Sequence, residues 1–286
     1  MSAVPFTESD PFSPIRYGYS LKEMLYSHKG PFGEIAIADH EYFGRMLILD
    51  GVVQLTERDE HYYHEMLAHV PLFTHPKPED ILIIGGGDGG TLREVLKHDT
   101  VRLATLAEID GGVIEVAQRF LPTLASGFSD PRAHVEITDG AKHVATMRDA
   151  YDIILVDCTD PVGPALSLFS EKFFADACAA LRAGGIFVAQ TESLHFHLDF
   201  VRDVQSKLGR HFAFADVYTV PIATYAGNWW TFSIGSKSTN PRKAGFRRSR
   251  SMPAKYYAPD VHKGAFLPPS LCRRLLLDGQ QSPPAH

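Results

Sequence analysis

The chain has 286 residues, 44% of them hydrophobic, and a formal net charge of −6 at pH 7. It is therefore long and apolar enough to bury a full core, and its acidic balance does not point to a nucleic-acid partner. No apolar run approaches the roughly 18 residues of a membrane span, and the first residues are polar and proline-bearing, so we expect neither a membrane span nor a secretory signal. Three cysteines without metal-ligand spacing favour a reducing compartment, and we expect a cytoplasmic protein.

Strand patterns come first along the chain. Residues 34–38 and 45–49 alternate between apolar and polar side chains, as half-buried strands do. The pair Asp50-Gly51 is a strong signal for a tight hairpin turn, which leads into a third strand at 52–55. This part of the chain is therefore predicted to be a small antiparallel β unit.

The next segment, from His64 to His69, looks like the metal-binding helix of a zinc protease with one residue too many. Five positions of an α-helix rotate the second histidine about 140° away from the first. We therefore predict no metal site.

Residues 81–95 are predicted to form a strand, a glycine-rich turn and a helix. The glycines of the turn that satisfy the GxGxxG pattern are Gly85, Gly87 and Gly90. An acid, Glu108, ends the following strand at 103–107, so a dinucleotide site is one interpretation. Asp88 argues against it, because a carboxylate inside a pyrophosphate cradle is repulsive. A cationic ligand that carries a nucleoside fits better, with Glu108 on the ribose and Asp88 facing positive charge.

The alternation of strands and helices then continues. We expect a helix at 111–120, a strand at 133–138, a helix at 141–148 and a strand at 152–156. Four acids then lie at one edge of a parallel sheet: Asp88, Glu108, Asp139 and Asp157. The fold class is predicted to be α/β, with a Rossmann-like doubly wound sheet of the class I methyltransferase type. The predicted division is an N-terminal β domain at 1–70, which closes over the crevice, and a catalytic domain at 71–286.

The most informative motif is the segment at 157–164, where Asp157 and Asp160 follow an apolar strand. Prolines at 161 and 164 prevent a helix from following at once, so both carboxylates should lie on a constrained loop. Ligands of open α/β sheets bind at this edge.

These segments resemble the polyamine aminopropyltransferases, and the spermidine synthases most closely. The matching segments include GVVQLTERDEHYYHE (51–65), LIIGGGDGGTLREVLKH (82–98), YDIILVDCTDPVGPALSLFS (151–170) and GGIFVAQTES (184–193). The resemblance spans residues 20–270. It implies transfer of an aminopropyl group from decarboxylated S-adenosylmethionine to a diamine, usually putrescine, which gives spermidine and methylthioadenosine.

The resemblance also implies roles for individual residues. Asp157 would accept the proton, Asp160 would hold the distal amine of the diamine, and Asp88 would hold the amine of the aminopropyl arm. The implied nucleoside site comprises Gly85, Gly87, Glu108, Asp139, Gly140 and Pro164, and the implied amine channel comprises Tyr63, His64 and Tyr225 with Gln54 nearby. Both reactants are cations, which carboxylates attract. No cofactor is implied, because the donor is a co-substrate, and the implied assembly is a homodimer or homotetramer.

Some positions depart from the family pattern. Gly33 stands where the family usually has a glutamine beside the nucleoside, and Ala223 replaces a proline. Trp229 and Trp230 follow, and they are expected to alter the far end of the acceptor pocket. The basic cluster at 247–250 is interpreted as a solvated surface rather than a nucleic-acid site.

Three other classes of protein share some of these features. An S-adenosylmethionine-dependent methyltransferase would share the fold and Glu108, but its cofactor bears a carboxylate that Asp88 should repel. A dinucleotide oxidoreductase would have no use for Asp157 and Asp160. A non-catalytic polyamine-binding protein would need the acids but not a nucleoside site. The preferred diamine and the size of the oligomer stay open.

Overall fold

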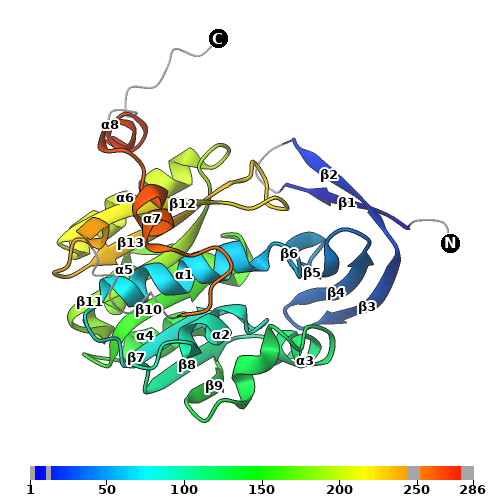
Figure 1. Cartoon of the computed structure of the whole chain (residues 1–286), viewed down its shortest axis with the longest axis horizontal. Helices are drawn as coiled ribbons and strands as arrows, with labels where there is room; N and C mark the ends of the chain where they lie inside the picture. Colours follow the sequence, from blue (N-terminus) through cyan, green and yellow to red (C-terminus); the bar gives the residue numbers. More distant parts are fainter. Residues whose placement is uncertain (1–3, 11–13, 244–251, 278–286) are drawn as a thin grey trace.

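The computed structural model describes residues 4–10, 14–243 and 252–277, and Figure 1 shows their arrangement. The strands are β1 (Val4–Ser9), β2 (Arg16–Leu21), β3 (Glu23–Gly30), β4 (Gly33–His40), β5 (Gly44–Leu49), β6 (Val52–Thr56), β7 (Asp80–Gly85), β8 (Leu103–Glu108), β9 (Ala133–Ile137), β10 (Tyr151–Asp157), β11 (Leu181–Ser193), β12 (Phe214–Pro221) and β13 (Trp229–Ser236). The helices are α1 (Glu60–Thr74), α2 (Gly90–Leu96), α3 (Gly111–Phe120), α4 (Gly140–Thr146), α5 (Glu171–Ala180), α6 (Leu198–His211), α7 (Pro259–Ala265) and α8 (Pro269–Cys272). None of the helices in this described part of the chain combines the length and the apolar character needed to cross a membrane. The basic cluster at 247–250 lies outside the described residues.

The N-terminal part folds as two antiparallel sheets, drawn in blue at one side of Figure 1. β1 pairs with β2, while β3, β4, β5 and β6 pair in sequence order as a meander. Asp50 and Gly51 form the turn between β5 and β6, and their φ values of 49° and 80° are those of a primed two-residue turn. The three strands and the hairpin turn predicted for this segment are confirmed.

The rest of the chain forms a mostly parallel sheet of seven strands. Their order is β12-β13-β11-β10-β7-β8-β9, and β13 runs against the direction of its neighbours. The chain leaves β7 toward β8 on one side and returns to β10 on the other side. This reversal opens a crevice at the carboxyl ends of β7 and β10. The predicted Rossmann-like doubly wound sheet is confirmed.

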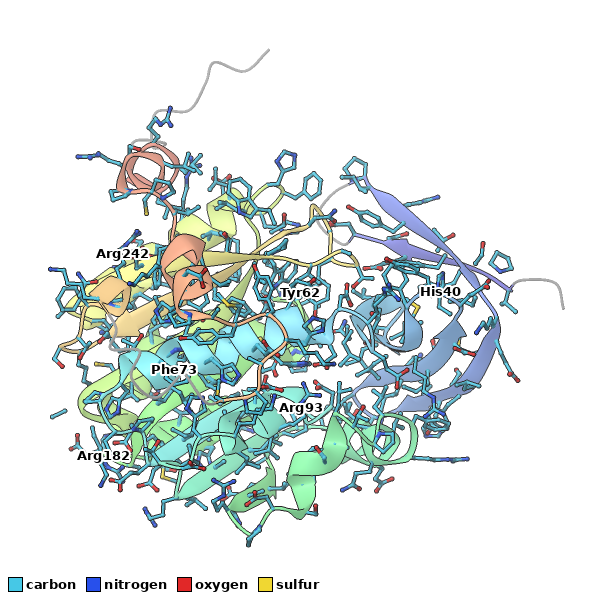
Figure 2. All side chains as sticks on the ribbon, in the orientation of Figure 1. His40, Tyr62, Phe73, Arg93, Arg182 and Arg242 are labelled. Carbon is cyan, nitrogen blue, oxygen red and sulfur yellow. The ribbon has the colours of Figure 1, made fainter. Side chains whose placement is uncertain are left out.

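Helices cover both faces of this sheet, because its central strands are apolar on both sides. Ile81 and Ile83 of β7 face a core shared with α1 and α2, whereas Leu82 and Ile84 face a core shared with α4, α5 and α6. Phe73 of α1 belongs to the first core and is labelled over the sheet in Figure 2. A third core joins the meander to α3, so the two parts of the chain pack directly on each other.

Two boundaries differ from the sequence-based expectations. The helix predicted at 141–148 is α4, which ends at Thr146 because the backbone of Met147 is extended. The domain division expected at residue 70 falls inside α1, and this helix packs on β10, β11 and β12. The change from the β meander to the α/β layers therefore lies before Glu60.

Candidate active site

A cleft of about 700 Å³ opens at the carboxyl ends of β7, β8 and β10, with the meander β4–β6 as its opposite wall. The predicted site residues that line it are Gln54, Tyr63, His64, Gly85, Gly87, Asp88, Glu108, Asp139, Gly140, Asp157, Pro164 and Tyr225. Asp160 instead lines an adjoining cavity of about 40 Å³. The residues that line both cavities are Gln54, Tyr63, Cys158, Thr159 and Tyr225. The structure therefore gathers all the predicted residues around two adjoining spaces that share part of their walls.

The glycine-rich turn after β7 lies directly on the end of β10. The amide of Gly86 donates a hydrogen bond to the backbone carbonyl of Asp157 over 2.8 Å. A Cβ at Gly85 would come within 2.1 Å of that carbonyl oxygen, and the φ values of Gly85 and Gly86 are 80° and 70°. Only glycine suits both the close approach and the left-handed backbone. The turn thereby brings Asp88 next to Asp157.

Asp157 ends β10 and accepts hydrogen bonds from two hydroxyl groups. The Tyr63 hydroxyl donates to Oδ1 over 2.8 Å, and the Thr91 hydroxyl donates to Oδ2 over 2.6 Å. Burial and the nearby Asp88 raise the pKa of Asp157, while His64 and the two hydroxyls act in the opposite direction. The net rise makes Asp157 a stronger proton acceptor than an exposed aspartate.

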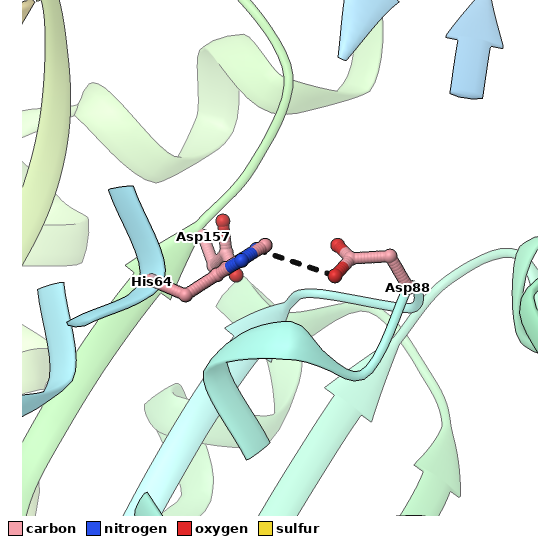
Figure 3. A group of neighbouring side chains, drawn as sticks. All are labelled: His64, Asp88 and Asp157. Carbon is pink, nitrogen blue, oxygen red and sulfur yellow. Dashed lines mark ion pairs between the residues drawn. The ribbon is translucent and has the colours of Figure 1, made fainter. Parts of the chain in front are cut away.

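His64 of α1 lies between two carboxylates. Its Nδ1 is 2.7 Å from Glu60 Oε2, and its Nε2 is 3.3 Å from Asp88 Oδ1. The dashed line in Figure 3 marks the ion pair between His64 and Asp88. Burial alone would lower the pKa of His64, but Asp88 and Glu60 outweigh it and raise the pKa to about 10. The ring is therefore an imidazolium at neutral pH. Burial opposes ionisation of Asp88, but this cation and the Gly90 amide lower its pKa.

The group His64, Asp88 and Asp157 offers ligand atoms that all lie within 4.8 Å of one another, a spacing compatible with a metal ion. A histidine binds a metal through the lone pair of a neutral ring nitrogen. Both nitrogens of His64 carry protons that point to carboxylates, so the ring has no lone pair to offer. The distances of His64 to its neighbouring carboxylates are those of an ion-pair network. His69 faces other partners, since its ring nitrogens lie 3.0 Å from His98 and 3.0 Å from Glu94.

At the other end of the cleft, Glu108 and Asp139 follow their strands as expected. Glu108 accepts hydrogen bonds from the amides of Gly87 at 3.1 Å and Asp110 at 2.8 Å. Burial raises the pKa of Glu108 to about 7, although these hydrogen bonds act to lower it. Asp139 caps α4 and accepts from its first amides. The roles expected for these residues toward a nucleoside stay predictions.

The small cavity is lined by carboxylates that the sequence motifs did not single out. Glu8 of β1, Asp10 just after it and Glu192 of β11 join Asp160 there. His197 lies 3.6 Å from Asp10 and 3.4 Å from Glu192. Burial and then Asp160 raise the pKa of Glu192 well above its usual range, and burial also raises the pKa of Asp160.

One of these acids, Glu192, reaches the cavity through an irregularity of the backbone, whereas Glu8 comes from a regular strand. Glu192 has a φ of 67° where the pairing of β11 shifts between Gln190 and Ser193, and such an irregularity redirects a side chain. Glu8 is buried, and its Oε2 has no hydrogen-bond partner among the described residues. Burial raises the pKa of Glu8 to about 7. Among the sequence segments that resemble the family, only GGIFVAQTES contains one of these two acids, Glu192.

Tyr225 connects the two cavities. Its hydroxyl donates to the carbonyl of Gln54, and its ring centroid lies 5.9 Å from that of Tyr63 and 4.7 Å from that of Trp230. Trp230 lines the small cavity, whereas Trp229 is 38% exposed and lies outside its wall. Of the two tryptophans expected at the acceptor end, only Trp230 lines this cavity.

Gly33 lies in the wall of the cleft, where the family pattern has a glutamine. A Cβ at Gly33 would come within 2.4 Å of the Asp50 carboxylate, which accepts a hydrogen bond from the amide of Glu34 over 2.8 Å. The Asp50 side chain therefore takes the space that a side chain at position 33 would need.

Comparisons with known proteins agree with this geometry. The family model described as the spermine/spermidine synthase domain matches residues 60–244, and the model described as the spermidine synthase tetramerisation domain matches residues 4–57. Polyamine aminopropyltransferase 1 of Aquifex aeolicus is 51% identical over 276 residues, which cover 96% of this chain and 98% of that protein. The polyamine aminopropyltransferase of Bacillus subtilis is 45% identical over 262 residues, which cover 91% of this chain and 95% of that protein.

Solved structures show the same relationship. A crystal structure of spermidine synthase in complex with the transition-state analogue AdoDATO has a TM-score of 0.92 at 36% identity, covering 96% of this chain and 94% of that one. The spermidine synthase of Thermotoga maritima has a TM-score of 0.89 at 36% identity, with the same coverage of both chains. The chain therefore belongs to the spermine/spermidine synthase family of polyamine aminopropyltransferases.

Proposed function

We propose that this enzyme transfers the aminopropyl group of decarboxylated S-adenosylmethionine to putrescine, which gives spermidine and 5'-methylthioadenosine. A primary amine of putrescine attacks the aminopropyl carbon that is bonded to the sulfonium. The C–N bond forms as the C–S bond breaks, and the electron pair of the C–S bond goes to sulfur, which becomes a neutral thioether. The amine proton passes to Asp157. The scheme needs no cofactor, because the sulfonium is already a good leaving group and positioning can supply much of the rate.

The observation that carries the proposal is the position of Asp157 beside the junction of the two cavities. Cys158 and Thr159, which follow it directly, line both spaces. A donor nucleoside in the large cleft, with its ribose at Glu108 and its ammonium at Asp88, would bring its sulfonium arm toward this junction. An acceptor whose far end lies at Asp160 would approach from the other side. The two reactants would then meet next to a buried carboxylate.

A proton acceptor is needed because the attacking amine is protonated in water. With a pKa near 10.4, forming the neutral amine at pH 7 costs roughly 4–5 kcal/mol. Asp157 has a raised pKa and is held by two hydroxyl donors. A basic, oriented carboxylate of this kind is suited to remove the proton as the C–N bond forms.

The small cavity supports a short diamine as the acceptor. A cavity of about 40 Å³ has room for a group of ammonium size, since a single water needs roughly 10–15 Å³ on the same measure. Its wall supplies Asp160, Glu192 and the buried Glu8 Oε2, which has no hydrogen-bond partner among the described residues. An ammonium with three donors suits these oxygens better than the larger planar guanidinium of agmatine.

We also infer a homodimer or homotetramer formed through the N-terminal sheets. The inference is supported by the match of residues 4–57 to a domain described by its role in tetramerisation. The oligomer size can be measured by light scattering of the full chain.

An acceptor panel tests the proposed reaction. The full-length enzyme is incubated with decarboxylated S-adenosylmethionine and putrescine, cadaverine, agmatine or spermidine, and methylthioadenosine and the polyamine product are measured by chromatography. Putrescine should give the highest kcat/KM, with spermidine as its product. Methyl transfer from S-adenosylmethionine would instead establish a methyltransferase. Binding of polyamines without any product would establish a binding protein.

A further inference from the structure

Behind the cleft, a chain of buried ionic contacts runs from Asp88 into the interior. His64 joins Asp88 to Glu60, and Glu60 Oε2 also accepts a hydrogen bond from the Arg93 guanidinium over 2.8 Å. Arg93 contacts Glu94 at 2.8 Å, and Figure 2 labels it next to α1. The side chains of Glu60 and His64 are each 3% exposed. Glu60 does not line the cleft. It can therefore influence the reacting groups through its ion pair with His64.

The charged groups that face His64 from the surrounding elements are carboxylates, and the Tyr63 ring lies edge-on to it at 5.4 Å between ring centroids. Glu60 faces it from the same helix, Asp88 from the turn after β7, and Asp157 from the end of β10. The backbone of α2 closes a further side, because a Cβ at Gly90 would come within 2.3 Å of His64 Cε1. The ring is therefore fixed in place among negative charges.

This arrangement matters because Asp88 and Asp157 are close. Two carboxylates that approach each other in a buried site tend to share one proton. Burial and Asp88 raise the pKa of Asp157, and His64 lowers it. Burial would also raise the pKa of Glu60, but His64 and Arg93 lower it to about 2, so Glu60 keeps its charge. The His64 cation is thus the group that compensates the two cleft carboxylates, and Glu60 is the anion that sustains it.

We propose that Glu60, anchored by Arg93, is a positioning residue for aminopropyl transfer, which holds His64 as an imidazolium between Asp88 and Asp157 so that both carboxylates are ionised before the substrates bind. The inference rests on the proposed function of Asp157 as proton acceptor. It assigns His64 the role of a fixed cation, distinct from that of a base.

The first test is the pH dependence of kcat/KM for the acceptor at saturating donor, from pH 5.5 to 9.5. Glu60→Gln keeps the size of the side chain but removes its charge, so His64 should lose its proton more easily and Asp157 should hold a proton to higher pH. The acid limb of the profile, where activity falls because Asp157 is protonated, should move up by roughly one pH unit. The value of kcat/KM should fall by up to about tenfold at the low-pH end, and the loss should narrow as the pH rises. The titration of the free amine is common to all variants and cancels in the ratio to wild type.

The second test observes His64 itself. In enzyme labelled with ¹⁵N-histidine, the His64 ring is assigned by its loss in His64→Gln, and its titration is followed by NMR. The wild-type ring should stay protonated beyond pH 9. In Glu60→Gln the midpoint should fall below about pH 6.5, so that the ring is neutral through the upper part of the acid limb. Arg93→Gln removes a positive charge from the other side of Glu60, so the ring should hold its proton at least as firmly as in wild type. Opposite effects of the two substitutions would not arise from general damage to packing.

Glu65→Gln is the matched control. Glu65 is also a buried acid of α1, but it accepts hydrogen bonds from the backbone amides at 255–257 and not from the cleft. Its substitution should move neither the acid limb nor the His64 titration. If Glu60→Gln does not fold, His64→Gln should show the same upward movement of the acid limb, because it removes the same cation.

The outcomes are distinct. An unmoved acid limb and an unmoved His64 titration in Glu60→Gln would overturn the positioning role while leaving the proposed reaction intact. Equal shifts in Glu60→Gln and Glu65→Gln would overturn it as well. Normal turnover by Asp157→Asn, in contrast, would exclude Asp157 as the proton acceptor and so contradict the proposed mechanism.

Discussion

Tyr63 and Asp157 are joined by a hydrogen bond of 2.8 Å that links α1 to the end of β10. Thr91 of α2 donates to the other oxygen of the same carboxylate. Both donors favour the ionised form of Asp157, whereas burial favours the protonated form, and the net effect is a raised pKa. The carboxylate is therefore both oriented and basic, which are the two properties that a general base requires.

The substitution Asp157→Asn should lower turnover by roughly 10²–10⁴ at pH 7, because it keeps the shape of the side chain but removes the basic oxygen. Raising the pH should partly restore the rate, since more of the amine is then already neutral. Steady-state kinetics from pH 7 to 10 measure both effects. Near-normal turnover at pH 7 would exclude Asp157 as the proton acceptor.

The substitution Asp160→Asn should act on binding rather than on turnover. Asp160 lines the small cavity and lies away from the proposed site of bond formation. Its charge would contact the distal ammonium in both the ground and the transition state, so the KM for putrescine should rise roughly 10-fold to 100-fold while kcat changes little. High pH should not restore this variant. A fall in kcat with an unchanged KM would contradict the assignment.

The substitution Asp88→Asn should reduce the discrimination between donors. Wild-type enzyme should bind decarboxylated S-adenosylmethionine better than S-adenosylmethionine by on the order of 100-fold, because a carboxylate near Asp88 is repelled. In the variant this repulsion is absent, so the affinities for the two compounds should approach each other. Calorimetric titration with both compounds measures the ratio. Equal affinities in the wild type would revive the methyltransferase alternative.

The sequence predicted those parts of the site that depend on one local rule. Asp88, Glu108, Asp139 and Asp157 each lie at or just after the carboxyl end of a strand, and parallel strands bring these ends to one edge. Their gathering around one cleft followed from the alternation of strands and helices.

Other site residues depend on contacts that no local pattern contains. Glu8 reaches the small cavity from the N-terminal hairpin, and Glu192 does so through an irregular backbone in β11. Glu60 and Arg93 meet because α1 packs on α2, 33 residues apart in sequence. The GGGDGG turn predicted a ligand site, but it did not show that Gly85 also makes room for the carbonyl of Asp157. Such relationships are set by tertiary packing, which strand and helix periodicity do not encode.

The last prediction concerns stability and rests on His262, a fully buried residue of α7. Its Nδ1 accepts a hydrogen bond from the Tyr257 hydroxyl at 2.9 Å, and its Nε2 donates to the carbonyl of Pro241 at 3.2 Å, a pattern that the neutral ring satisfies. Burial lowers the pKa of His262 to about 4, below the value of about 6.5 expected in the unfolded chain. The unfolded state therefore binds a proton that the native state does not. The stability contributed by the neutral ring is complete above pH 6.5, and it is lost as the pH falls toward 4, by on the order of 3 kcal/mol.

Urea unfolding of the full-length enzyme between pH 7.5 and 4.5 tests this assignment. The free energy of unfolding should fall less steeply with decreasing pH in His262→Gln than in wild type, because the variant has no ring to protonate in the unfolded state. His28→Gln removes an exposed histidine of β3 and should keep the wild-type slope. The acidic groups titrate in all three proteins, so their contribution cancels in the comparison. Parallel pH profiles for wild type and His262→Gln would show that His262 titrates alike in the folded and unfolded chains, and that burial does not hold its ring neutral.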